Sequence, residues 1–304
     1  MLRLDFAILH MLDHKRQGLA ARKYFLDRLA PVFFSPRVEH LIDFGDLGLK
    51  GCNVFLPLGE SNWQQLEADM RGYMWKKSEG ILQEYAVTNM AADRRLKNTF
   101  EPSEAMFPLV FGDHFIKALA AVLVRHTLER RSVDKLVLVG NMAELLPLLD
   151  HLSDYRLPIS VQNQQPGRGE ITAQRLLYEK GLAISNSYIS PENWTQGDLI
   201  ILFQPGYKRM ALAAPGAFYL ELNDESQDLA PSLEHALARA GMDHRLPILA
   251  PILESIMYTK AGISQREIED NDLDYELKSG TDLEALIDIG EQLGVWDPFR
   301  HSCG

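Results

Sequence analysis

Only two cysteines, Cys52 and Cys303, occur among the 304 residues. Two cysteines are too few for a disulfide framework, and Cys303 lies one residue from the end, where chains tend to fray. Disulfides are characteristic of oxidising compartments. The scarcity of cysteine therefore predicts a protein of the reducing cytoplasm.

Long apolar stretches are missing as well. No apolar run approaches the roughly 18 residues that a membrane-spanning helix needs. The first residues, Met1 to Asp5, are not followed by the long apolar core and small residues of a signal peptide. We therefore expect neither a membrane span nor a secretion signal.

Positive charge is in deficit. The chain carries 31 Lys and Arg against 42 Asp and Glu, a formal net charge of −11. Because broad nucleic-acid and anionic-membrane surfaces are built from Lys and Arg, neither partner is expected. The deficit is uneven: residues 263–304 hold eleven acidic and three basic side chains. This segment suits a solvated surface or a contact with a partner, and the rest of the chain leaves a local basic pocket open.

Motifs for metal binding and covalent catalysis are absent from the sequence. The nine histidines form neither HExxH nor HxH, and His10 and His14, four residues apart, have no third ligand nearby. The acidic stretch 269–276 lacks the glycine and the final glutamate of a calcium loop. No nucleophile–base constellation is evident. We therefore assign no metal ligand and no catalytic residue.

An alternation of apolar strands and amphipathic helices occupies residues 135–224. The run 199–203 is apolar without interruption, as in a strand covered on both faces. Strands are expected over 135–140, 158–162, 182–185, 198–203 and 218–222, and helices over 142–152 and 170–180. This order predicts an α/β fold with a Rossmann-like, mostly parallel, doubly wound sheet.

The flanking segments predict a smaller N-terminal α/β domain and C-terminal helices that pack back. Before the main sheet we expect helices over 1–30, 62–77, 90–96 and 111–131, a hairpin of 38–44 with 52–58, and a strand over 80–88. After it we expect helices over 232–240, 247–259 and 281–293. The predicted domains are 1–130, 131–245 and 246–304.

Polar residues follow the strands of the predicted main sheet. In open parallel sheets, ligands bind beyond the carboxyl ends of the strands, near the point where the strand order reverses. The loops at these ends include Gly140, Asn141, Asn163, Gln204 and Asn223. Carboxamides donate and accept hydrogen bonds, so these residues are candidates for binding a neutral polar ligand. The alternative is that Asn and Gly serve turn geometry alone.

The loop after the first strand of this sheet departs from a dinucleotide fingerprint. The pattern G-x-G-x-x-G lets the backbone approach a pyrophosphate, whereas here only Gly140 is present. Met142 would crowd a pyrophosphate and Glu144 would repel it. Asn163 and Arg168 could instead accept a ribose 2′-phosphate, so binding of NADP stays open. The favoured interpretation is a Rossmann-like sheet without a dinucleotide.

Charged residues follow the fourth and fifth strands of the same sheet. Lys208 could act as a general base or bind a carboxylate, and Asp224 and Glu225 could supply acid–base chemistry or hold a ribose. Each of these side chains could equally be a solvated loop residue.

The expected layout is similar to that of two-domain NADP-dependent dehydrogenases of the shikimate type, in which a substrate domain precedes a Rossmann-like domain and C-terminal helices return. This resemblance is architectural and implies oxidoreduction with NADP as cofactor. Three hypotheses follow for the function: binding of a small polar or nucleotide-like ligand in an inter-domain cleft, atypical NAD(P)-dependent oxidoreduction, or a non-catalytic scaffold that forms homo-oligomers or captures a partner.

Overall fold

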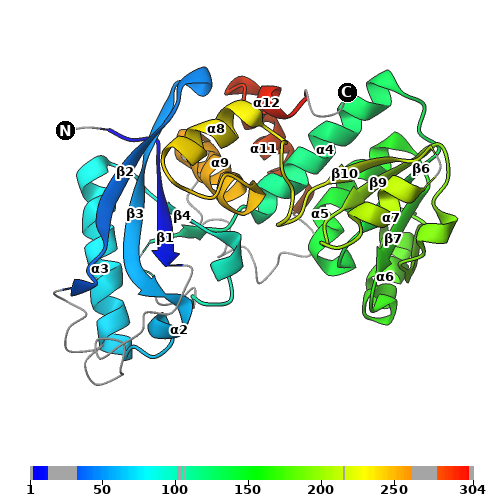
Figure 1. Cartoon of the computed structure of the whole chain (residues 1–304). Coiled ribbons are helices and arrows are strands. Elements are labelled where there is room, and N and C mark those ends of the chain that lie inside the picture. The colour runs from blue at the N-terminus through cyan, green and yellow to red at the C-terminus, as the bar shows by residue number, and fades with distance from the viewer. Residues whose placement is uncertain are drawn as a thin grey trace. The chain divides into compact units, whose positions relative to one another are not determined.

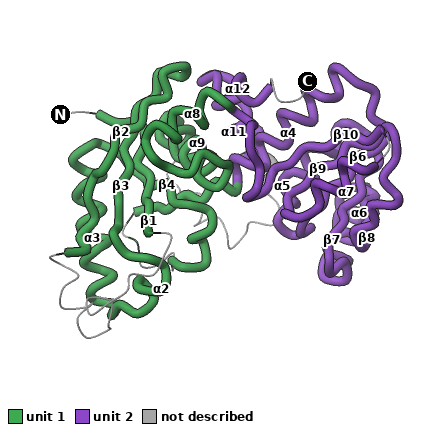
Figure 2. Tube along the Cα trace, in the orientation of Figure 1, with its two compact units in different colours: residues 1–113, 231–272 green, residues 114–230, 273–304 purple. Residues whose placement is uncertain are grey.

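The computed structural model describes residues 3–12, 33–100, 105, 107–214, 216–261 and 279–300. The chain forms two compact units, and each is assembled from two separate stretches of sequence (Figure 2). Unit 1 comprises residues 1–113 and 231–272, and unit 2 comprises 114–230 and 273–304. The units therefore divide the chain elsewhere than the predicted boundaries at 130 and 245, because helix packing, which the linear order does not reveal, decides to which unit each helix belongs.

Unit 1 contains a five-stranded sheet in the order β2-β3-β1-β4-β5 (Figure 1). The strands are β1 (Phe6–Leu12), β2 (Arg37–Phe44), β3 (Leu49–Gly59), β4 (Met90–Ala92) and β5 (Leu109–Val110). β2 and β3 form the predicted antiparallel hairpin, and all other pairs are parallel. Four parallel strands therefore end at one common edge.

Strand β1 corrects the helix expected over 1–30, of which residues 13–32 lie outside the described part. Phe6, Ile8 and Leu9 are fully buried, and β1 lies between β3 and β4. A central parallel strand is covered on both faces, so its apolar residues run without the alternation that marks an exposed strand. The helical spacing comes from Leu12, Leu19, Tyr24, Leu26 and Leu29, and all of these except Leu12 lie outside the described residues.

The helices of unit 1 contain a second correction. They are α2 (Glu60–Trp63), α3 (Ala68–Tyr85), α8 (Pro231–Arg239) and α9 (Leu246–Ala261). The strand expected over 80–88 is wrong, because Gly80 to Tyr85 form the last turns of α3, where Leu82 is buried and Ile81 and Tyr85 pack on the core. The short helix expected over 90–96 is instead β4 followed by a 3-10 turn, Arg94–Leu96.

Helix α9 packs back onto the sheet of unit 1. It lies against β1, β4 and β5, and its residues from Leu246 to Tyr258 are buried. Asn89 joins it to the sheet by donating hydrogen bonds to the Ser255 carbonyl, at 3.5 Å, and the Thr259 hydroxyl, at 3.1 Å. The predicted return of a C-terminal helix is thus present within unit 1.

Unit 2 contains the predicted parallel sheet. Its strands are β6 (Lys135–Val139), β7 (Ile159–Asn163), β8 (Ile184–Tyr188), β9 (Asp198–Leu202) and β10 (Phe218–Glu221). All pairs are parallel, in the order β10-β9-β6-β7-β8. The chain moves from β6 through β7 to β8 on one side and then returns to β9 on the other. This is the doubly wound order of a Rossmann-like sheet, with its reversal between β6 and β9.

Helices complete unit 2. They are α4 (Asp113–Arg130, in unit 2 from His114), α5 (Met142–Leu152), α6 (Glu170–Lys180), α7 (Lys208–Ala213), α11 (Ser279–Gln292) and α12 (Asp297–Arg300). Gly181 ends α6 with a φ of +66°, as predicted from its position. α11 packs on α5, and Trp296 stacks on Phe115 with ring centroids 5.2 Å apart. Short 3-10 turns cover Ser153–Tyr155, Pro166–Gly169 and Pro191–Asn193 in this unit, and Gly45–Leu47 in unit 1. Among the described helices, none has the length and apolar character to cross a bilayer.

Candidate functional site

The loops after β6 and β9 meet at the carboxyl edge of the unit 2 sheet, where the strand order reverses. The Phe203 backbone N–H donates to the Val139 carbonyl at 3.0 Å, which extends the β6–β9 pairing to the ends of both strands. A Cβ on Gly140 would lie 3.2 Å from side-chain atoms of Leu145 and Phe203. Gly140 therefore allows α5 and the β9 loop to pack closely, which explains this glycine without a ligand.

Asn141 caps helix α5. Its Oδ1 accepts from the Ala143 N–H at 3.3 Å, and its Nδ2 donates to the Glu144 carboxylate at 3.1 Å. Helix N-termini favour anions because their backbone N–H groups lack partners within the helix. Here one such N–H is already capped and a carboxylate sits in the first turn, so the start of α5 opposes a pyrophosphate.

Asn163 shapes the turn after β7. It is buried, its Oδ1 accepts from the Gln165 N–H at 2.8 Å, and its Nδ2 donates to Asn186 Oδ1 at 3.3 Å. Asn186 in turn donates to the Pro166 carbonyl at 2.6 Å. Arg168 lies exposed on this turn, and its guanidinium forms no hydrogen bond or ion pair within the part of the chain that the structure describes.

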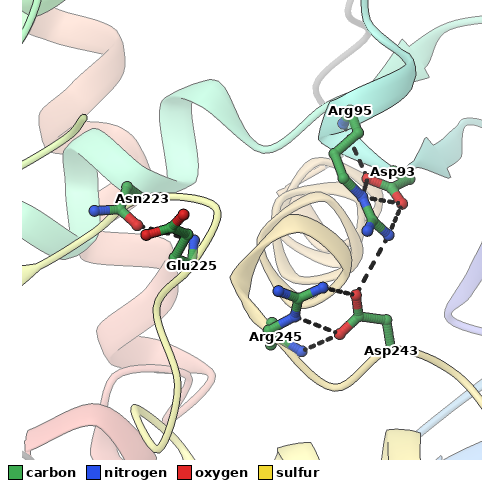
Figure 3. Close-up of polar contacts among 6 residues, drawn as sticks. All are labelled: Asp93, Arg95, Asn223, Glu225, Asp243 and Arg245. Atoms are coloured by element: carbon green, nitrogen blue, oxygen red, sulfur yellow. Dashed lines mark hydrogen bonds and ion pairs between the residues drawn. The ribbon is translucent and has the colours of Figure 1, made fainter. Parts of the chain in front are cut away.

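Asn223 ties together the loops after β9 and β10. Its N–H donates to the Ser226 hydroxyl at 2.8 Å and its Nδ2 to the Gln204 carbonyl at 3.1 Å. Its Oδ1 accepts from the Glu225 N–H at 2.8 Å (Figure 3). Asn223 is also buried, so these contacts occupy its donors and its acceptor. It positions the edge of the sheet rather than offering a free amide.

Gln204 is the exception among these carboxamides. It follows β9 at the reversal point, its side chain is partly buried, and its Oε1 is inaccessible to water. No hydrogen-bond partner for this oxygen exists among the described residues. A buried acceptor without a donor costs about 1–3 kcal/mol, so Gln204 marks a position where a further donor would be stabilising.

The Lys208 side chain forms an ion pair with Glu221. Its Nζ donates to the Glu221 carboxylate at 2.8 Å, and Glu221 is 8% exposed. The hydrogen bond to Glu221 raises the pKa of Lys208 above its ordinary value. A lysine held in the protonated form opposes the general-base interpretation.

The carboxyl edge of the unit 1 sheet carries a charged chain that the sequence did not reveal. Asp93, directly after β4, accepts from Arg95 Nε at 2.9 Å, and Arg95 Nη2 also lies 3.3 Å from the Asp243 carboxylate. Asp243 accepts two bonds from Arg245, at 2.7 and 3.0 Å (Figure 3). Hydrogen bonds from Arg245 lower the pKa of Asp243, and the same bonds raise the pKa of Arg245.

Asp113 forms a second charged group in unit 1, after β5. It accepts from Arg94 at 2.8 Å and from Lys97. Burial raises the pKa of Asp113, but the charges and hydrogen bonds of Arg94 and Lys97 outweigh it, and the pKa lies below its ordinary value. The run Asp93-Arg94-Arg95 was a usable signal, but the wrong helix over 90–96 hid that it ends a strand.

Unit 1 is expected to lose stability in acid through these two carboxyls. Because both folded-state pKa values lie below the ordinary 3.8, their contribution is present above that pH and is lost as the pH falls through the lower values. The melting temperature should therefore drop as the pH falls below about 4. Asp243→Asn should flatten this drop, whereas Asp46→Asn, at an exposed position without an ion pair among the described residues, should not. Equal acid profiles for the two variants would contradict the assignment.

Metal ligation has little support in the described part of the chain, where no three His, Cys, Asp or Glu side chains converge. His10 is partly buried in β1, and His14 and Cys303 lie outside the described residues. Cys52 is buried, and burial raises the pKa of its thiol to about 12, so it is not a nucleophile at neutral pH.

Comparison with known proteins gives similarities of fold. No family model matches the sequence, and no curated protein matches it either. L-tryptophan dehydrogenase from Nostoc punctiforme is similar at 11% identity and a TM-score of 0.43, over 97% of this chain and 86% of that chain. A chorismate mutase/shikimate 5-dehydrogenase fusion protein from Clostridium acetobutylicum is similar at 14% identity and a TM-score of 0.32, over 96% and 100% of the two chains. Shikimate 5-dehydrogenase from Thermus thermophilus, in complex with NADP(H) and shikimate, is similar at 13% identity and a TM-score of 0.31, over 96% of this chain and 100% of that chain. The Rossmann-like α/β fold of this chain follows from its own strand order and parallel pairing.

Proposed function

We propose that unit 2 binds a small, neutral, nucleoside-like ligand at the carboxyl edge of its parallel sheet, with Gln204 as the residue that selects it. The observation that carries the proposal is the buried Gln204 Oε1, which has no hydrogen-bond partner among the described residues. Its place at the reversal of strand order is where doubly wound sheets bind their ligands.

The chemistry of this edge favours a ligand rich in donors and poor in negative charge. A ribose hydroxyl or an exocyclic amino group would supply the donor that Gln204 Oε1 lacks. Glu144 in the first turn of α5 disfavours phosphate at the neighbouring helix start. Asn163 and Asn223 anchor their own loops, whereas the Gln204 side chain has to turn its buried Oε1 toward the ligand.

Replacing Gln204 with methionine is expected to change stability and binding in opposite directions. The apolar side chain has a similar length but no buried acceptor, so the ligand-free variant should be more stable by about 1 kcal/mol. Nucleosides that stabilise the wild type should lose most of their effect on the variant. Adenosine, guanosine, cytidine and uridine, each titrated in thermal denaturation of the full chain, provide the measurement.

Gln174→Met is the matched control, since Gln174 is exposed on α6 of the same unit. This variant should leave both the melting temperature and the nucleoside response unchanged. If no nucleoside stabilises the wild type, or if Gln204→Met lowers the stability of the free protein, the proposed site is wrong.

A second candidate function, NADP-dependent oxidoreduction, is favoured by one observation. The Arg168 guanidinium lies exposed after the second strand of the sheet without a partner among the described residues, a position suited to a ribose 2′-phosphate. NADPH and NADH, added to the same titration, separate the two candidates. A ligand at 100 times its Kd adds about 2.7 kcal/mol to the free energy of unfolding. A gain of this size with NADPH, and a much smaller gain with NADH and adenosine, would favour the oxidoreductase.

A further inference from the structure

A cavity of about 520 Å³ lies in unit 2 at the opposite edge of the sheet from Gln204. Its lining comes from the residues around the end of α4 and from the amino ends of β6, β9 and β10, and includes Thr127, Arg131, Asp134, Gln196, Asp198 and Phe218. Its volume falls in the range of roughly 300–1,000 Å³ that is typical of small-molecule sites. This cavity is separate from the proposed nucleoside site and shares no lining residue with it.

Arg131 provides a positive charge with free donors in this cavity. Its guanidinium carbon lies 4.5 Å from the centroid of the Phe218 ring, so the face of the group is held by the aromatic surface. Its side chain forms no ion pair or hydrogen bond within the described residues. The N–H groups along the edge of a stacked guanidinium remain available to a carboxylate, which they can bind in a two-pronged arrangement.

Asp134 provides the opposite charge. Its N–H donates to the Gly197 carbonyl at 2.8 Å, and its carboxyl group occupies the place where a Cβ of residue 197 would stand. Gly197 has a φ of +92°, a backbone conformation that favours glycine. The missing Cβ also leaves room for the Asp134 carboxyl group. The Asp134 carboxylate has no ion pair or hydrogen bond in the described part of the chain.

The third charged residue of the lining is already neutralised. Asp198 is buried, accepts from the Thr195 N–H at 2.9 Å and pairs with Lys135 at 3.1 Å. The cavity therefore presents one positive and one negative group, Arg131 and Asp134, that are paired neither with each other nor with another described residue. Two such groups of opposite sign in one cavity complement a ligand that carries both charges.

We propose that this cavity binds a small zwitterion of the amino-acid type, with its carboxylate on Arg131 and its ammonium group on Asp134. Because Arg131 and Asp134 are both exposed, solvent weakens each contact, and the expected affinity lies in the millimolar range.

Saturation-transfer NMR on the full chain tests the proposal with four ω-amino acids of increasing length: glycine, β-alanine, 4-aminobutyrate and 6-aminohexanoate. At least one of the four should bind. Butyrate and butylamine, which each lack one charge, should bind at least tenfold more weakly than the amino acid that binds best. Arg131→Gln and Asp134→Asn should each weaken the zwitterion at least tenfold. Both side chains are exposed and form no ion pair among the described residues, so Asp134→Asn should melt at the wild-type temperature and Arg131→Gln only slightly below it, through the lost contact with Phe218.

Matched controls remove the same charges outside the lining. Arg130→Gln and Glu192→Gln, both at exposed positions of unit 2, should leave zwitterion binding unchanged. Gln204→Met should also leave it unchanged, which keeps this site distinct from the nucleoside site. The proposal is overturned if none of the four amino acids binds, if butyrate binds as well as 4-aminobutyrate, or if the control variants weaken binding as much as the cavity variants.

Discussion

Replacing Trp75 with alanine is expected to lower the free energy of unfolding of unit 1 by about 3–5 kcal/mol. Trp75 lies in α3 and is 1% exposed. Its ring meets Trp63, Phe100 and Phe107 edge to face, with centroids 5.1, 5.2 and 5.7 Å away. The truncation would open a large void in the middle of these rings, and three neighbouring aromatic side chains cannot collapse into it without losing their own contacts.

A two-unit protein does not have one free energy of unfolding, so the measurement has to be local. Amide hydrogen exchange in α3 and β3 should report the full loss, and exchange in β6 and β9 should change much less. Trp75→Phe should cost far less than alanine, because it retains a ring and removes an indole N–H that has no partner among the described residues. Tyr178→Ala, at an 85% exposed aromatic on α6, should leave stability nearly unchanged. A loss below about 1 kcal/mol for Trp75→Ala would contradict this account of the core.

Replacing Gly290 with alanine is expected to destabilise unit 2 by about 2–3 kcal/mol, although the substitution improves helix propensity. Gly290 lies within α11, and its added Cβ would overlap the indole of Trp296. That indole cannot move easily, because it is fully buried, its Nε1 donates to the Ile287 carbonyl at 2.9 Å and its ring stacks on Phe115. The collision therefore outweighs the roughly 1 kcal/mol that alanine contributes in an open helix.

Gly80→Ala provides the control of opposite sign. Gly80 is exposed within α3, and no atom lies within 4 Å of its added Cβ. This substitution should stabilise unit 1 by about 0.5–1 kcal/mol. Urea unfolding of both variants, with hydrogen exchange in α11 and α3 as the local readout, checks the pair. A stabilising Gly290→Ala would show that Trp296 is free to repack.

The sheet of unit 2 was predictable because local pattern and tertiary context agree there. β6 and β9 are short apolar runs, and Gly181 ends a helix where the chain needs a left-handed residue. Unit 1 was less predictable, because β1 pairs with β3 and β4, which lie far away in sequence. The strand expected from Gly80 is also part of a helix, because one exposed glycine costs the 18-residue α3 only about 1 kcal/mol and so does not end it.

The strand-end positions of the candidate residues were predictable from the sequence, but the contacts of their side chains were not. Sequence order alone placed Asn163, Gln204 and Asn223 at strand ends, but the same amide group can be either engaged or unpaired. Asn163 is hydrogen-bonded to Asn186 of β8, and Asn223 to the Gln204 carbonyl of the loop after β9, so both partners are distant in sequence. Only the three-dimensional contacts separate Gln204 from the other two. An inter-domain position of the ligand, the cytoplasmic location and self-association stay predictions.

The discontinuous make-up of the two units has a consequence for the protein during its synthesis. The strands of unit 1 are complete at residue 110, but α9, which covers β1, β4 and β5, ends only at residue 261. At about 5–20 residues per second, the ribosome needs roughly 7–30 s to make the intervening chain. During this time the apolar faces of β1, β4 and β5 lack the cover that α9 provides. The newly made protein should therefore depend on chaperones that bind exposed apolar surface more than a protein of the same length with two consecutive domains.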